Sequence, residues 1–139
     1  MTAAHEHFHH QLKQGMFGTW DFNDPLYLQS LRQAIKNSQA YADLKQADQS
    51  GKFMSRQGRG YAKIKPQMLQ YIMDEEEMCC RSYGQLIAIE AGDPVMYFQI
   101  VSALADPVSM FWRQYWEFDD FKPIAVELKK LLQNRGNNP

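Results

Sequence analysis

Cysteine is scarce in this chain, and its two cysteines, Cys79 and Cys80, are neighbours. Adjacent residues on one helix do not close a disulfide easily because their Cβ atoms diverge. Free thiols suit a reducing compartment. A metal site is expected to use spaced cysteines with a second pair, which the sequence does not have. We therefore expect both cysteines to pack in the core.

Charge of one sign is not in excess. The chain has 139 residues with 15 Lys and Arg against 16 Asp and Glu, and its net charge is -1. This net charge excludes electrostatic attraction of the whole protein to nucleic acid or to a membrane surface. Any such binding must therefore come from a local patch of charge.

Long hydrophobic runs are also missing. The most apolar stretch, 95–112, is interrupted by Gln99, Ser102, Asp106 and Pro107, which makes it too short and too polar to span a bilayer. The N-terminal sequence MTAAHEHFHHQLKQG has no apolar segment of the kind found in signal peptides. The expected location is cytoplasmic, with no membrane partner.

Histidine is absent beyond residue 10, although His5, Glu6 and His9 form the pattern H-E-x-x-H. On a helix this spacing puts both histidines on one face, where zincins bind zinc and use the glutamate as a base. The pattern lies close to the chain end, where a water-excluding site is hard to build, and no distant third histidine exists. We expect incidental metal affinity at most, and no catalytic zinc.

Other catalytic patterns are absent as well. The sequence contains neither a P-loop nor a G-x-S-x-G elbow. Glu76 and Glu90 lie on an apolar helical stripe, but they are roughly 21 Å apart along the axis and cannot act as one carboxylate pair. Structural pairing with Lys or Arg is the expected role of both. The sequence thus predicts a non-enzymatic protein with no catalytic residues, no cofactor and no metal.

The sequence does contain several signals for the start of a helix. Asp-Pro occurs at 24–25, 93–94 and 106–107, each time before an apolar periodic run. Asp is a favoured N-cap, and Pro fits the first helical position; Pro66 and Pro123 mark two further starts. The fold class is all-α, a single compact domain over 1–139 with two long and three short helices, at about 25–47, 66–91, 94–104, 107–118 and 123–134.

The ends and the core follow from the same patterns. Residues 1–15 are expected to be a frayed or edge-packed N-terminal segment, and 135–139 a polar tail. Apolar residues at helical spacing form the predicted core. Its members are Leu28, Leu31, Ile35, Leu69, Ile72, Tyr83, Leu86, Ile87, Leu128 and Leu131.

A basic segment separates the two long helices. It spans 49–65 and is expected to be an irregular, exposed loop whose glycines let the backbone approach a ligand closely. Arginine suits phosphate contacts, and Tyr61 could stack on a base. The candidate nucleic-acid-binding residues are Lys52, Arg56, Arg59, Tyr61, Lys63 and Lys65. The leading hypothesis is a helical binding subunit that contacts nucleic acid or a nucleoprotein complex; a solvated linker is the plain alternative.

Aromatic residues are concentrated in MFWRQYWEFDDF, residues 110–121. On the helix predicted at 107–118, their arc is wider than an ordinary buried stripe, and Trp and Tyr dominate interface hot spots. The candidate interface residues are Phe111, Trp112, Tyr115 and Trp116. This pattern favours the alternative function, an adaptor or chaperone-like module that binds a protein partner or a second copy, unless the helix is packed centrally.

Overall fold

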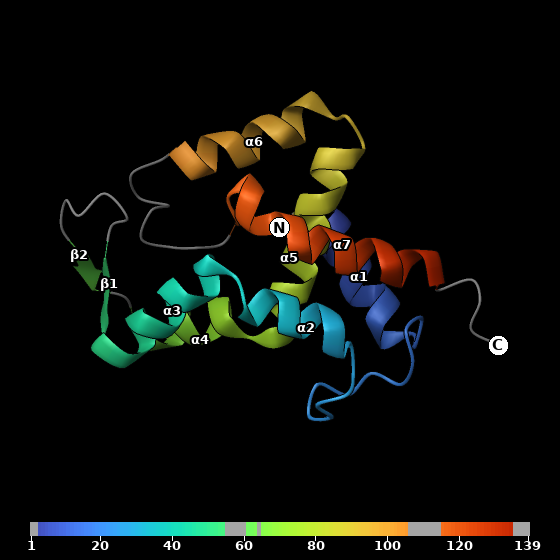
Figure 1. Ribbon diagram of the computed structural model, residues 1–139, viewed down its shortest axis with the longest axis horizontal. Helices are drawn as coiled ribbons and strands as arrows, with labels where there is room; N and C mark the ends of the chain where they lie inside the picture. Colours follow the sequence, from blue (N-terminus) through green and yellow to red (C-terminus); the bar gives the residue numbers. More distant parts are fainter. Residues whose placement is uncertain (1–2, 55–60, 64, 106–114, 135–139) are drawn as a thin grey trace.

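The computed structural model describes residues 3–54, 61–63, 65–105 and 115–134 (Figure 1). Within them the chain is helical, which confirms the all-α class, but seven helices replace the predicted five. The structure also contains a two-stranded antiparallel hairpin. The elements are α1 (Ala3–Lys13), α2 (Gln29–Lys36), α3 (Gln39–Ser50), β1 (Lys52–Met54), β2 (Tyr61–Lys63), α4 (Pro66–Met73), α5 (Glu75–Glu90), α6 (Pro94–Ala105) and α7 (Phe118–Asn134).

The first predicted helix, 25–47, starts later and is broken into α2 and α3. Asp24 closes a turn by accepting from the Leu26 backbone N–H at 2.9 Å, and Leu28 adopts a left-handed conformation before α2. The Arg32 guanidinium holds this turn by donating to the carbonyls of Asp24 and Tyr27, at 2.7 and 3.0 Å. The Asp-Pro pair therefore forms a turn that precedes the helix.

Capping residues explain both breaks in the long helices. Between α2 and α3, Ser38 is extended and its Oγ accepts from the Tyr41 N–H. Between α4 and α5, Asp74 accepts from the Glu77 N–H at 3.0 Å. Side chains of this kind satisfy N–H groups of a new first turn. The three glutamates after Asp74 also favour a helix start, because they lie at the positive end of the helix dipole.

The C-terminal third agrees with the prediction in part. α6 matches the helix expected at 94–104. Of the helix expected at 107–118, residues 107–114 lie outside the described residues, and 115–117 are not helical. α7 begins at Phe118 and contains Pro123 in its interior, so the predicted start at Pro123 was wrong. Asp120 in its first turn accepts from the N–H groups of Gln39 and Ala40 at the start of α3.

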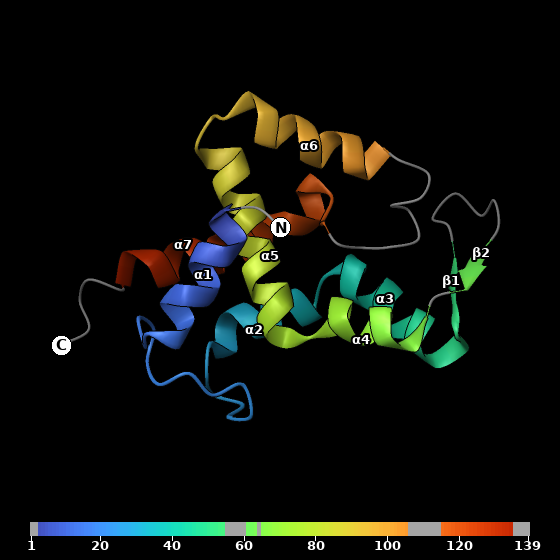
Figure 2. The ribbon, with the colours of Figure 1, turned by 180° about the vertical axis from the view of Figure 1, so that it is seen from behind.

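The core surrounds α5, which crosses the middle of the molecule with α1, α2 and α7 packed against it (Figures 1 and 2). Most of the predicted core is buried; Ile87 and Leu131 are only partly buried. Cys79 and Cys80 are fully buried and free, which confirms their packing role. Within the described residues, no helix is both long and apolar enough to cross a membrane.

Helix α1 is part of this core, so of the two predicted alternatives for the N-terminal segment, frayed or edge-packed, the frayed one was wrong. Phe8 and Leu12 in α1 are fully buried. The Phe8 ring stacks on that of Tyr83 in α5, with centroids 4.6 Å apart. His5 is also buried. The spacing i, i+3, i+7 puts these side chains on one face, and burial of that face outweighs the polar character of the segment.

The segment predicted as an irregular loop contains a hairpin. Gly51 ends α3 in a left-handed conformation, β1 follows at once, and β1 pairs with β2 in an antiparallel ladder. A small second core of Leu44, Ala47, Leu69 and Ile72 joins α3 to α4. The hairpin stands beyond these two helices at one end of the molecule (Figures 1 and 2).

Candidate functional site

The hairpin carries part of the predicted nucleic-acid site. Lys52 lies in β1, whereas Tyr61 and Lys63 lie in β2. Lys65 is exposed and directly precedes α4. Arg56 and Arg59 lie outside the described residues. The register pairs Lys52 with Lys63 across the ladder.

The structure describes two of the four residues of the predicted protein interface. Phe111 and Trp112 lie outside the described residues, and Tyr115 is half-buried. Trp116 is buried, and its indole N–H donates to Ser38 Oγ at 3.1 Å. Its backbone is bonded to the Gln85 side chain through both the N–H and the carbonyl. Trp116 is therefore a core residue, and its assignment to an exposed interface was wrong.

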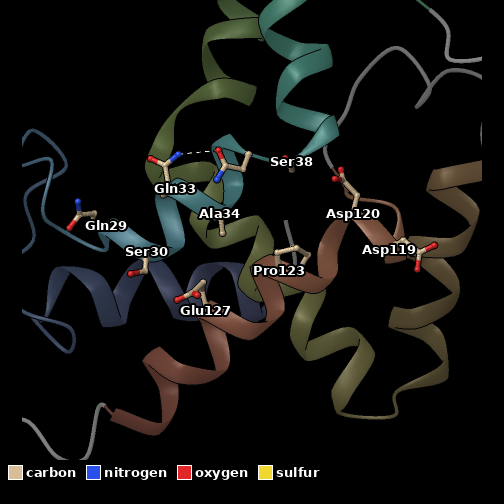
Figure 3. Close-up of a pocket in the computed structure, with 10 residues that line it drawn as sticks. Gln29, Ser30, Gln33, Ala34, Ser38, Asp119, Asp120, Pro123 and Glu127 are labelled. Carbon is tan, nitrogen blue, oxygen red and sulfur yellow. Dashed lines mark hydrogen bonds between the residues drawn. The ribbon is translucent and has the colours of Figure 1, made fainter.

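A cleft lies between α2 and the first half of α7 (Figure 3). Its polar groups are amides, two hydroxyls and carboxylates, and Asp120 already caps α3. We assign no chemistry to it. The lining residues are Gln29, Ser30, Gln33, Ala34, Asn37, Ser38, Asp119, Asp120, Pro123 and Glu127.

The densest group of titratable side chains joins α1 to the first turn of α5. His5 Nε2 lies 3.0 Å from His9 Nε2 and 3.0 Å from Glu77 Oε2. His9 Nε2 lies 3.0 Å from the other oxygen of Glu77, Oε1. Within the described residues, donor atoms of His5, His9 and Glu77 all lie within 4.8 Å of one another, close enough to hold one metal ion.

A second carboxylate orients this group. His9 Nδ1 lies 2.5 Å from Glu76 Oε2. The Trp20 indole N–H donates to the other oxygen of Glu76 at 2.5 Å. Glu76 thus has His9 and Trp20 as partners, where the sequence predicted Lys or Arg. Glu90 pairs with Lys129 at 2.8 Å, as expected.

Burial sets the protonation of His5. Desolvation lowers the pKa of His5 below its ordinary value of 6.5, although the nearby Glu77 carboxylate acts in the opposite direction. The pKa of Tyr71 is raised, first by burial and then by the charge and hydrogen bond of Glu77. His5 is therefore predominantly neutral at neutral pH, the form that metal coordination requires.

The sequence suggested two members of the cluster and missed the third. The H-E-x-x-H spacing does bring His5 and His9 together, but the expectation of a frayed segment removed them from consideration. The third group is a carboxylate from DEEE, 72 positions from His5 along the chain.

No protein-family model, no curated protein and no solved structure matches this chain.

Proposed function

We propose that this protein is a helical binding subunit that contacts nucleic acid through the basic hairpin segment, residues 51–65. The observation that carries the proposal is a two-stranded antiparallel ribbon in the most basic stretch of a nearly neutral chain. The major groove of duplex DNA is wide enough to admit such a ribbon. Duplex DNA is therefore the first ligand to test.

The position of the hairpin supports this reading. β1 packs along α3, and the ribbon lies at the end of the molecule, away from the central helix α5 (Figures 1 and 2). A partner can therefore reach it without disturbing the main core. Lys52, Arg56, Arg59, Lys63 and Lys65 would supply the phosphate contacts, which set affinity but carry no sequence code.

The test compares binding of a labelled duplex of mixed sequence by two charge variants. The first replaces Arg56, Arg59 and Lys63 with Gln. The second makes the same change in net charge on α7 by replacing Lys122, Lys129 and Lys130, all well exposed. We expect the hairpin variant to lose most of its binding at low salt and the α7 variant to keep it. If both variants lose duplex binding equally, the loss comes from the change in net charge and not from the hairpin, and the proposal fails.

A protein-binding module is the second candidate, and α6 is the observation that favours it. Val95 and Phe98 on this helix are 64% and 68% exposed, and Ile100 is its one buried residue. Apolar side chains this exposed are typical of interaction sites when they are contiguous. If the wild-type protein binds neither duplex nor single strand at low salt, this candidate replaces the first.

A further inference from the structure

The histidine–glutamate cluster brings two ring nitrogens and both oxygens of one carboxylate within hydrogen-bonding distance of one another. His9 Nδ1 faces a carboxylate oxygen of Glu76 and must donate to it. In a neutral ring, His9 Nε2 then carries a lone pair, and this lone pair faces Glu77 Oε1 at 3.0 Å. A metal ion at this point would bind both the ring nitrogen and the carboxylate oxygen.

The geometry fits a metal ion. In a tetrahedral site with bonds of about 2.0–2.1 Å, neighbouring ligand atoms are about 3.3 Å apart. The contacts of His5 Nε2 with His9 Nε2 and Glu77 Oε2 are 3.0 Å, so a small movement opens the space for an ion. Both histidines present Nε2, from adjacent turns of one helix.

The surroundings complete the pattern of a metal site. Ligating histidines usually donate their second ring N–H to a carboxylate, which fixes the tautomer and ring orientation. Glu76 holds His9 in this way and is itself held by Trp20. The side chains of His9 and Glu77 are each 16% exposed, so the group lies near the surface and an ion can enter from solvent.

We propose that His5 Nε2, His9 Nε2 and the Glu77 carboxylate bind one divalent first-row transition metal ion, with Glu76 as the outer partner of His9. Two imidazoles and one carboxylate favour ions such as Zn²⁺ over Mg²⁺ or Ca²⁺, which prefer oxygen ligands. The ion joins α1 to the start of α5. Three protein ligands leave at least one coordination position for water.

Charge in the cluster is compatible with a divalent ion. Glu76 and Glu77 provide two negative charges beside the two imidazoles. Arg81 is the nearby cation whose charge acts on His5. Its guanidinium is buried and donates to the Ile72 carbonyl. With neutral histidines these groups sum to a net charge of -1, which an incoming cation offsets.

The experiment is a calorimetric titration of the metal-free full-length protein with Zn²⁺. The matched control replaces His7 and His10 with Gln, because both are exposed on the same helix and contribute to any unspecific histidine-rich binding. The test variants are His9→Gln and Glu77→Gln. The Glu76→Gln variant probes the outer partner, and circular dichroism checks that each variant is folded.

We expect one Zn²⁺ per chain in the wild type and in the His7/His10 control, with equal affinity. Glu76→Gln should weaken binding roughly 10–100-fold, the usual effect of losing an outer partner. His9→Gln and Glu77→Gln should weaken it at least about 100-fold, because each removes a direct ligand. Zn²⁺ should also raise the melting temperature of the wild type and the control, but not of the two ligand variants.

Two results would overturn the proposal. One is the absence of Zn²⁺ binding by the wild type. The other is loss of binding in the His7/His10 control to the same extent as in His9→Gln, which would mean an adventitious ion only. If the ligand variants do not fold, Co²⁺ added to the wild type decides the question. A visible spectrum unlike that of aqueous Co²⁺, abolished by one equivalent of Zn²⁺, supports the site, and an unchanged spectrum contradicts it.

Discussion

The Gln85 side chain forms both backbone hydrogen bonds of Trp116. Its Nε2 donates to the Trp116 carbonyl at 2.7 Å, and its Oε1 accepts from the Trp116 N–H at 3.0 Å. Gln85 and Trp116 are both buried, so these backbone groups have no access to solvent. The amide thus replaces the pairing that a helix or strand would give, and it ties the segment before α7 to the central helix.

Replacing Gln85 with Leu should therefore be costly. Both Trp116 groups would remain buried without partners, at about 1–3 kcal/mol each, so the free energy of unfolding should fall by at least about 2 kcal/mol. Urea denaturation measures this. Gln70→Leu, at an exposed position of α4, should change it by no more than about 0.5 kcal/mol. Equal effects of the two substitutions would mean that the Gln85 bonds are not formed.

The N-terminal helix should contribute to the main cooperative transition. Phe8 is fully buried against Tyr83, and Phe8→Ala should lower the free energy of unfolding by about 3–5 kcal/mol. His7→Ala on the exposed face of the same helix should have an effect within about 0.5 kcal/mol. A Phe8→Ala protein as stable as the wild type would show that α1 is detached in solution.

Acid should weaken the contact between α2 and α5. Burial alone would raise the pKa of Glu75, but hydrogen bonds from Lys36 and Arg32 bring it below the ordinary value of 4.5. A carboxyl with a lowered folded-state pKa stabilises the fold above its unfolded pKa and loses that contribution as pH falls.

The Glu75→Gln variant should therefore be less stable than the wild type at neutral pH, and the difference should shrink as pH falls below 4.5. Unfolding free energies of both proteins across this range provide the measurement. Glu90→Gln breaks the exposed pair with Lys129 and should have an effect of no more than about 0.5 kcal/mol at any pH. A pH-independent difference for Glu75→Gln would contradict the assignment.

Both thiols should be unreactive in the folded protein. Cys79 and Cys80 are fully buried, and burial raises the pKa of each well above its ordinary value. The thiolate is the reactive form, so a thiol reagent should modify them only as fast as the protein unfolds, and at once in denaturant. Rapid modification of either residue under native conditions would mean that α5 is not at the centre of the core.

The helical class and most of the core could be predicted, because periodic apolar residues such as Leu31, Ile35 and Leu86 define faces that must be buried. The helix boundaries were harder to predict from the sequence. Ser38 and Asp74 interrupt runs whose periodicity continues on either side, and only their capping bonds show the breaks. Both capping residues are visible in the sequence. As indicators of a helix boundary, however, they are weaker than the apolar periodicity that continues across them.

The errors at the candidate sites have a different cause. Trp116 was assigned to an interface because aromatic density alone does not distinguish a surface from a core; its partners Ser38 and Gln85 lie far away in the chain. The proposed metal-binding group was missed for the same reason, since Glu77 comes from α5. Pairing of this kind depends on tertiary packing, which periodicity does not encode.

The salt dependence of duplex binding tests the proposed function most directly. With three to five phosphate contacts at about 0.9 per contact for a duplex, the slope of log K against log salt should be roughly -2.7 to -4.5 for the wild type. Replacing Arg56, Arg59 and Lys63 with Gln should flatten the slope by about two to three, and the α7 control variant should leave it unchanged. Parallel slopes for all three proteins, or no binding by the wild type at about 50 mM salt, would contradict a nucleic-acid role for the hairpin.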